Sequence, residues 1–155
     1  MKHYLVKHIV KDHGPVTKVY KEIEHRYYGV PYAMTKKEKE SLEAANGSKI
    51  WVVEVENNKG STNYYLAYSF HCTEVRKPAF RAYPEGYTRQ LTVDPDRDIQ
   101  GSYFPKPVLI ENKAIQAILA SYTYGFELLR NEAITYFNEL TAKHGETLVD
   151  FERKY

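Results

Sequence analysis

Two runs in the middle of the chain alternate between apolar and polar positions with the two-residue period of β-strands. In the run 49–56, one face carries Trp51, Val53 and Val55. In the run 64–75, every second residue is apolar or aromatic, namely Tyr64, Leu66, Tyr68, Phe70 and Cys72. Turn-forming residues fill the segment 57–61 between the runs. The pattern predicts an antiparallel hairpin with a longer loop, in which each strand buries one face.

Shorter signals on either side of the hairpin predict an α+β chain. β-Branched and apolar residues predict a strand at 4–10, and apolar residues at helical spacing predict a short helix over 16–23. Further strands are expected at 79–83, 87–93 and 108–110, and prolines are expected to keep regular structure short between 77 and 106. Asn112 is expected to cap one helix, and a second helix is predicted from Asn131 to His144.

A helix start is also predicted before the hairpin. Thr35 and Glu38 have the spacing of a capping box, and Asn46-Gly47 provides a stop. Leu42 and Ala45 would then face inward. The preceding segment 27–32 contains Gly29 and Pro31 and is expected to form an irregular loop.

Length and composition fit a single domain covering residues 1–155. The hydrophobic fraction is 43%, which is ordinary for a globular protein, and no apolar run approaches the ~20 residues of a membrane span. Cys72 is the one cysteine, so no internal disulfide can form. These features predict a cytoplasmic location without membrane association.

Charge is unevenly distributed along the chain, and tyrosine is unusually frequent. Residues 1–49 contain ten Lys and Arg against six Asp and Glu, whereas residues 111–155 contain five against seven. The sequence also has 15 tyrosines, a residue that combines an apolar ring with a polar hydroxyl and suits stacking surfaces. This distribution favours a mildly anionic partner at one face of the molecule.

Catalytic and metal-binding signatures are missing from the sequence. The six histidines lack the local pairing of a zinc site and are interpreted as scattered surface residues. The segment His71-Cys72-Thr73 matches one phosphate-binding element of two-histidine phosphoesterases, but no second copy exists. Asp94, Asp96 and Asp98 are spaced like calcium ligands, yet the required glycine and glutamate are replaced. No catalytic residue, metal or cofactor is therefore predicted, and the chain is not expected to be an enzyme.

The order of elements over residues 3–75 resembles EVE-type and related domains of the PUA-like superfamily. The resemblance is carried by the loop 27–32 (Tyr-Tyr-Gly-Val-Pro-Tyr), the lysine-rich segment after it, and the strand that begins with Gly47-Ser48-Lys49-Ile50. Ser48 stands where the family usually has Asp. The later segment 103–107 is similar to PUA-like modules attached to modification-dependent restriction enzymes. This resemblance implies a small, strongly bent antiparallel β-barrel with flanking and C-terminal helices.

The resemblance also implies a function, namely reading a single base, often a modified one, flipped into an aromatic pocket. DNA is the favoured target over RNA. The residues that would line the base pocket are Tyr28, Val30, Tyr32, Trp51, Tyr65 and Tyr68. The residues that would contact phosphates are Lys36, Lys37, Arg76, Lys77, Arg81 and Arg89.

Two alternatives remain open at this stage. Tyrosine enrichment also suits a protein–protein inhibitor or adaptor, such as a counter-defence protein of a phage or mobile element. A nuclease or phosphoesterase that uses His71 is the third hypothesis.

Overall fold

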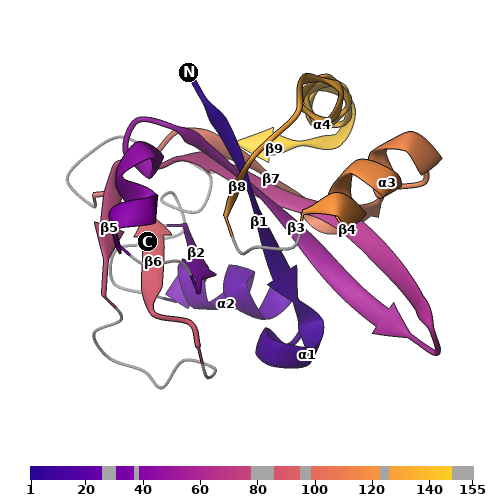
Figure 1. The fold of residues 1–155 in the computed structure, drawn as a ribbon, viewed down its shortest axis with the longest axis horizontal. Coiled ribbons are helices and arrows are strands. Elements are labelled where there is room, and N and C mark those ends of the chain that lie inside the picture. The colour runs from indigo at the N-terminus through magenta and orange to yellow at the C-terminus, as the bar shows by residue number, and fades with distance from the viewer. Residues whose placement is uncertain (26–30, 37–38, 78–85, 95–98, 123–125, 148–155) are drawn as a thin grey trace.

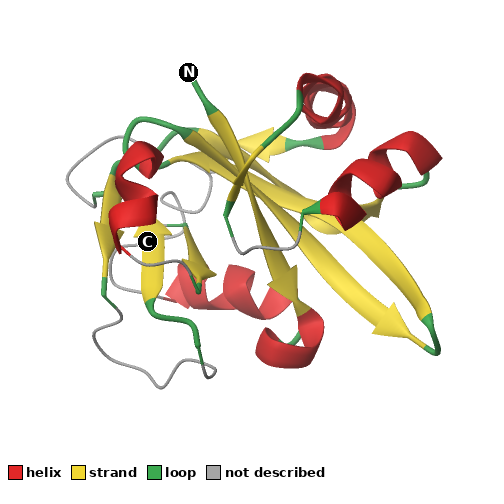
Figure 2. Ribbon diagram, viewed as in Figure 1, coloured by secondary structure: helices red, strands yellow, loops and turns green. Residues whose placement is uncertain are grey.

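The computed structural model describes residues 1–25, 31–36, 39–77, 86–94, 99–122 and 126–147. Its helices are α1 (Val10–His13), α2 (Thr17–His25), the 3-10 helix η1 (Lys39–Ala45), α3 (Lys113–Ser121) and α4 (Asn131–His144). Its strands are β1 (His3–Ile9), β2 (Tyr32–Thr35), β3 (Lys49–Asn58), β4 (Ser61–His71), β5 (Glu74–Arg76), β6 (Arg89–Thr92), β7 (Gly101–Leu109), β8 (Glu127–Leu128) and β9 (Glu146–Thr147). The predicted α+β class is confirmed (Figures 1 and 2).

The strands form two sheets. The large sheet has the order β8-β1-β3-β4-β7-β9, and the small sheet has the order β2-β6-β5. β1 and β3 pair in parallel, whereas the other pairs are antiparallel. No closed barrel is present among the described strands, so the bent barrel stays a prediction.

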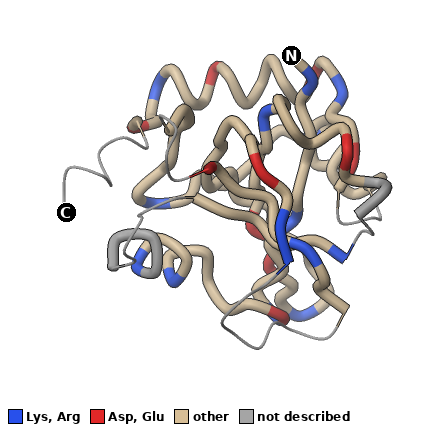
Figure 3. The backbone as a smooth tube through the Cα atoms, turned by 90° about the vertical axis from the view of Figure 1, so that its left-hand side faces the viewer, with Lys and Arg blue, Asp and Glu red and all other residues tan. Residues whose placement is uncertain are grey.

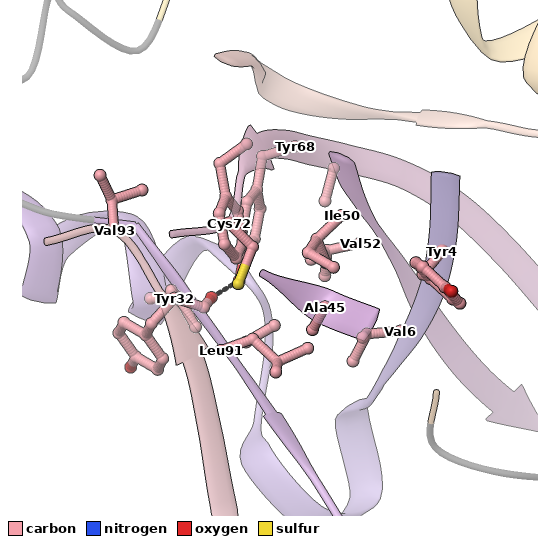
Figure 4. Packing of buried hydrophobic residues seen from close by; sticks show 14 of the residues in the cluster. Tyr4, Val6, Tyr32, Ala45, Ile50, Val52, Tyr68, Cys72, Leu91 and Val93 are labelled. Atoms are coloured by element: carbon pink, nitrogen blue, oxygen red, sulfur yellow. Dashed lines mark hydrogen bonds between the residues drawn. The ribbon is translucent and has the colours of Figure 1, made fainter. Parts of the chain in front are cut away.

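Each face of the large sheet has its own hydrophobic core. On one face, Trp51, Val53 and Leu66 pack with Leu119 of α3 and Phe137 of α4. The other face packs against α2, η1 and the small sheet, and its core is drawn in part in Figure 4. The central strands are therefore covered on both sides. This explains why β3 is buried at six consecutive positions from 50 to 55, all of them apolar except Glu54.

The predicted hairpin is confirmed as β3–β4, with a shorter turn than expected. The expectation that each strand buries one face is wrong, because cores lie on both faces of the sheet. The strands extend to Asn58 and Ser61, which pair with one another and leave only Lys59 and Gly60 in the turn. Both turn residues have positive φ, 48° and 85°, as a two-residue turn matching the twist of the strands requires.

A β-bulge at Ala67 changes which face the second half of β4 presents. Val53 pairs with Leu66 but Val52 pairs with Tyr68, so Ala67 is the extra residue. Leu66 therefore lies in the core beneath α3 and α4, whereas Tyr68 lies in the core beneath α2 and the small sheet. The expectation that Leu66 and Tyr68 share a face is wrong, because one inserted residue reverses a period of two.

Two further sequence expectations are corrected. Thr35 does not cap a helix, because it ends β2, pairs with Arg89 and is fully buried. Strand β7 is longer than the expected 108–110 even though it contains Pro105 and Pro107. The ladder with β4 passes directly from Tyr103 to Val108, so both prolines lie in a stretch that has no paired partner among the described residues.

The C-terminal helices follow the sequence closely. The Asn112 side chain accepts a hydrogen bond from the Ile115 backbone N–H at 3.1 Å and caps α3, as predicted. The bounds of α4 are the predicted Asn131–His144. The predicted strand 79–83 and most of the loop 27–32 lie outside the described residues.

Candidate functional site

At one end of the small sheet, β2 and β5 end beside the start of β6, and this brings basic residues together. Thr35 at the end of β2 pairs with Arg89 at the start of β6, and Arg76 at the end of β5 pairs with Gln90. Lys36 follows β2 directly and Lys77 follows β5 directly. We call the set Lys36, Arg76, Lys77 and Arg89 the basic end. Figure 3, in which the small-sheet side faces the viewer, shows several basic segments close together there.

Only part of this positive charge is neutralised within the described residues. Arg76 donates to the Glu74 carboxylate at 2.7 Å. The Arg89 guanidinium donates to the Thr88 carbonyl at 2.8 Å, a contact that leaves its charge uncompensated. Lys36 and Lys77 are exposed. The basic end thus offers cations from three elements, and among the described residues Glu74 is their one acidic partner, so the basic end suits an anionic ligand.

A cluster of polar and aromatic side chains adjoins Lys36. The Lys36 ammonium lies 4.8 Å from the centre of the Tyr87 ring, and the Tyr87 hydroxyl donates to the Asp12 carboxylate at 2.8 Å. The His13 ring meets the edge of Tyr87 at 4.4 Å and lies 5.0 Å from the His8 ring. The cluster connects α1 to the basic end, so the orientation of Lys36 depends on a cation–π contact built by distant segments.

Burial shifts the pKa of two groups in this cluster. The pKa of His13 is lowered to about 4, first by desolvation and then by neighbouring His8, with Lys36 acting in the same direction and Asp12 against it. The pKa of Tyr87 is raised, first by desolvation and then by its hydrogen bond to Asp12. At neutral pH His13 is therefore uncharged and Tyr87 keeps its proton.

Acidification is expected to destabilise the fold through His13. As the pH falls below the ordinary histidine value of 6.5 towards about 4, the unfolded chain takes up this proton before the folded one, so stability falls. Because the side chain is only half-buried, we expect solvent screening to reduce the effect to about 1 kcal/mol. The free energy of unfolding in urea should depend less on pH in His13→Gln than in the wild type. The control His144→Gln, at the exposed end of α4, should keep the full dependence.

The structure separates the aromatic residues expected to line one base pocket. Trp51 is fully buried against Phe137 of α4, with ring centres 5.4 Å apart. Tyr68 is buried on the opposite face of the sheet, where its hydroxyl donates to the Tyr32 carbonyl at 2.5 Å. Tyr32 is buried in the same core as Tyr68 (Figure 4). The expectation that Trp51 and Tyr68 share a cavity is wrong, because the bulge at Ala67 places them on different faces.

The remaining sequence candidates fall into two groups. Tyr65 is half-buried on β4 and pairs with Glu54. Four candidates lie outside the described residues: Tyr28, Val30, Lys37 and Arg81. Ser48, which replaces the Asp of the resembled family, is buried, and its hydroxyl donates to the Ala45 carbonyl at 2.6 Å, so it joins η1 to β3.

Sequence reasoning missed the roles of two histidines. His8 is buried, not on the surface, and its Nε2 lies 2.8 Å from the Gly14 carbonyl oxygen. The available signal was position, because His8 lies near the end of a predicted strand and His13 just before Gly14-Pro15, where a chain reversal brings them together. Tyr87 and Asp12 carried no such signal, since 75 residues separate them in the chain.

The described residues contain no cluster of three or more His, Cys, Asp or Glu with the arrangement of a metal site. Cys72 is buried, its thiol contacts the Glu74 carbonyl, and desolvation raises its pKa, so it packs as a small hydrophobe as predicted. None of the described helices combines the length and apolar character needed to cross a membrane.

Comparison with known proteins identifies a distant structural likeness. Neither a protein-family model nor a curated protein matches the sequence. A solved structure that is similar is the crystal structure of a mutant of the ZmASCH protein from Zymomonas mobilis. The two chains are 14% identical in sequence, and their structural alignment covers 90% of this chain and 99% of the Zymomonas mobilis chain, with a TM-score of 0.46. A likeness at this level assigns neither a family nor a function to the chain.

Proposed function

We propose that this protein is a nucleic-acid-binding module and that the basic end contacts the phosphate backbone. The observation that carries the proposal is the convergence of Lys36, Lys77 and Arg89 from three strand ends. Cations grouped in this way attract the regularly spaced charges of a nucleic acid, and each phosphate contact releases counterions. The excess of basic over acidic residues in segment 1–49 also favours binding of an anionic partner.

The location of the basic end favours an extended ligand. Arg89 and Leu91 lie two residues apart on β6 and so share the face of the small sheet that packs against the large one. Arg89 therefore lies at the partly exposed start of β6, on the side of the small sheet that faces the large one. A strand of nucleic acid crossing this edge meets Lys77, Arg89 and Lys36 in succession, because their strands are neighbours.

Base recognition is a separate part of the proposal. Tyr32 and Tyr68 are buried and present no open ring face to a ligand. A base would therefore be read by Tyr28 and Val30, which lie outside the described residues, together with the half-buried Tyr65. Stacking on one such ring would contribute roughly 1–3 kcal/mol per base.

Removing charge from the basic end is expected to weaken binding for all sequences alike. Lys77→Gln and Arg89→Gln should each weaken binding of a fluorescent oligonucleotide about fivefold, ~1 kcal/mol, since each loses one phosphate contact. The slope of log affinity against log salt should decrease by roughly 0.7–0.9 per charge. Fluorescence anisotropy over a salt series measures both quantities, on single-stranded and duplex DNA and RNA of one sequence.

Matched controls remove the same charge elsewhere. Lys59→Gln lies in the β3–β4 turn and Lys106→Gln lies in the unpaired stretch of β7, and both side chains are exposed. If these controls reduce the salt slope as much as Lys77→Gln does, the basic end is not the contact surface. Absence of salt-dependent binding to any of the four nucleic acids would refute the proposed function.

A further inference from the structure

A row of three basic side chains crosses the large sheet near one end, away from the basic end. His3 of β1 pairs with Lys49 of β3, and Lys49 pairs with His71 of β4. Directly paired residues project from the same face of a sheet with Cβ atoms about 5 Å apart. Trp51, two residues after Lys49, packs on α4, so the row lies on the face that α3 and α4 cover. We call His3, Lys49 and His71 the cationic row.

Trp51 fixes the orientation of two members of the row. Its indole N–H donates to Nδ1 of His3 at 2.8 Å, and the two rings stack with centres 6.2 Å apart. The Lys49 ammonium lies 4.4 Å from the centre of the same indole ring. Because an indole nitrogen only donates, Nδ1 of His3 is the acceptor and the proton of the neutral imidazole resides on Nε2. The row therefore presents the Nε2–H of His3 beside the ammonium of Lys49.

The charge of the row is not compensated by the described residues, among which none of the three side chains forms an ion pair with a carboxylate. The pKa of Lys49 is lowered by burial. The pKa of His3 is lowered first by burial and then by Lys49 and the chain's amino terminus. Desolvation is the first cause of both shifts, and positive neighbours add to the shift of His3 alone. A bound anion would oppose both shifts by favouring the charged forms.

A further polar side chain, that of Ser69, lies two residues before His71 on β4. Ser69 pairs with Trp51 and so shares its face, and it is only 1% exposed. Its hydroxyl makes no hydrogen bond with the described residues. Buried hydroxyls are nearly always satisfied, so Ser69 is a polar group beside the row that has hydrogen-bonding capacity left over among the described residues.

We propose that the cationic row binds a phosphate group. A phosphate monoester has a charge of about −1.5 to −2 at neutral pH and three acceptor oxygens, which match a row of one ammonium and two imidazole donors better than a single carboxylate does. The row includes the histidine of the His71-Cys72-Thr73 element and supplies it with basic partners from β1 and β3. The phosphate belongs either to a small phosphorylated compound or to the end of a nucleic acid. The inference does not rest on the proposed function, because the cationic row and the small sheet lie on opposite faces of the large sheet.

Titration with inorganic phosphate tests the site directly. In NMR spectra of the histidine rings, phosphate should shift the His3 and His71 signals along a saturable curve and raise the pKa of His3, whereas exposed His144 should stay unchanged. Lys49→Met keeps a long unbranched side chain beside Trp51 but removes the charge. It should raise the dissociation constant at least about tenfold, ~1.4 kcal/mol. Lys106→Met removes an exposed charge elsewhere and should leave the constant unaltered.

A second variant keeps the test decisive if Lys49→Met disturbs folding. His71→Gln, at the partly exposed end of β4, should also weaken phosphate binding while circular dichroism shows an intact fold. Oligonucleotides with a 5′-phosphate or a 5′-hydroxyl then distinguish the two sources. A preference for the 5′-phosphate that free phosphate abolishes identifies a nucleic-acid end. Equal binding of both oligonucleotides, together with saturable binding of free phosphate, excludes a nucleic-acid end and leaves a small phosphorylated compound as the source. The inference is overturned if phosphate leaves the His3 and His71 signals unchanged, or if folded Lys49→Met and His71→Gln bind phosphate as the wild type does.

Discussion

Trp51→Ala is expected to lower the free energy of unfolding by about 3–5 kcal/mol. The side chain is fully buried, it packs on Phe137 and it holds the His3 ring, so its removal leaves a cavity between the large sheet and α4. Domains of ordinary stability have only about 5–15 kcal/mol in total. Urea unfolding followed by circular dichroism measures the loss.

A conservative replacement distinguishes a core residue from a base-stacking one. Trp51→Phe retains an apolar ring in the core but loses the hydrogen bond to His3, so we expect a smaller destabilisation. Nucleic-acid affinity should be the same in Trp51→Phe as in the wild type, because the ring does not reach the basic end. If Trp51→Phe is as stable as the wild type but loses selective binding, Trp51 is a base-stacking residue and the core interpretation is wrong.

Tyr68→Ala is expected to be destabilising by a similar amount, about 3–5 kcal/mol, through the other core. The ring is 2% exposed and meets the edge of Tyr20 with centres 5.9 Å apart. Its hydroxyl donates a hydrogen bond to the buried backbone carbonyl of Tyr32 in strand β2 of the small sheet. Tyr68 therefore links the large sheet to the small sheet, and so helps to position the basic end.

Tyr68→Phe separates the hydroxyl from the ring. Loss of one buried hydrogen bond should lower the free energy of unfolding by about 1–2 kcal/mol. Tyr65→Ala is the matched control, since Tyr65 lies three residues earlier on β4 but is only half-buried. It should destabilise the fold less than Tyr68→Ala does. Equal stability of wild type and Tyr68→Ala in urea would show that the ring is not a core element.

Local sequence signals were enough to predict an element when its hydrophobic period and its capping residues all lie within one short segment. Alternation over 49–56 and 64–75 sufficed to predict that the β3–β4 hairpin exists, although not the bulge at Ala67. The Asn112 side chain with the 3.6-residue period sufficed for α3. The limits of α4 were predicted for the same reason. In each case the hydrogen bonds that define the element join residues close in the chain, so the sequence contains both partners.

Thr35 shows where local signals were misleading. With Glu38 it has the spacing of a helix cap, yet its backbone pairs with Arg89, more than fifty residues away. A strand partner at that distance offers hydrogen bonds and burial that a cap on a short helix does not, and the choice between them is made by packing. The candidate contacts Lys36, Arg76, Lys77 and Arg89 were each found in the sequence, but their grouping follows from the pairing of the small sheet.

The sequence by itself determined the hairpin, the C-terminal helices and the basic and aromatic residues available for binding. Only the tertiary structure decided which of them meet. The bulge at Ala67 sends Tyr68 to the face opposite Trp51, and strand register places His3 and His71 on either side of Lys49. Side-chain direction along a strand alternates with every residue, so a single inserted position reverses it, and register between strands is set by the packing of both faces together.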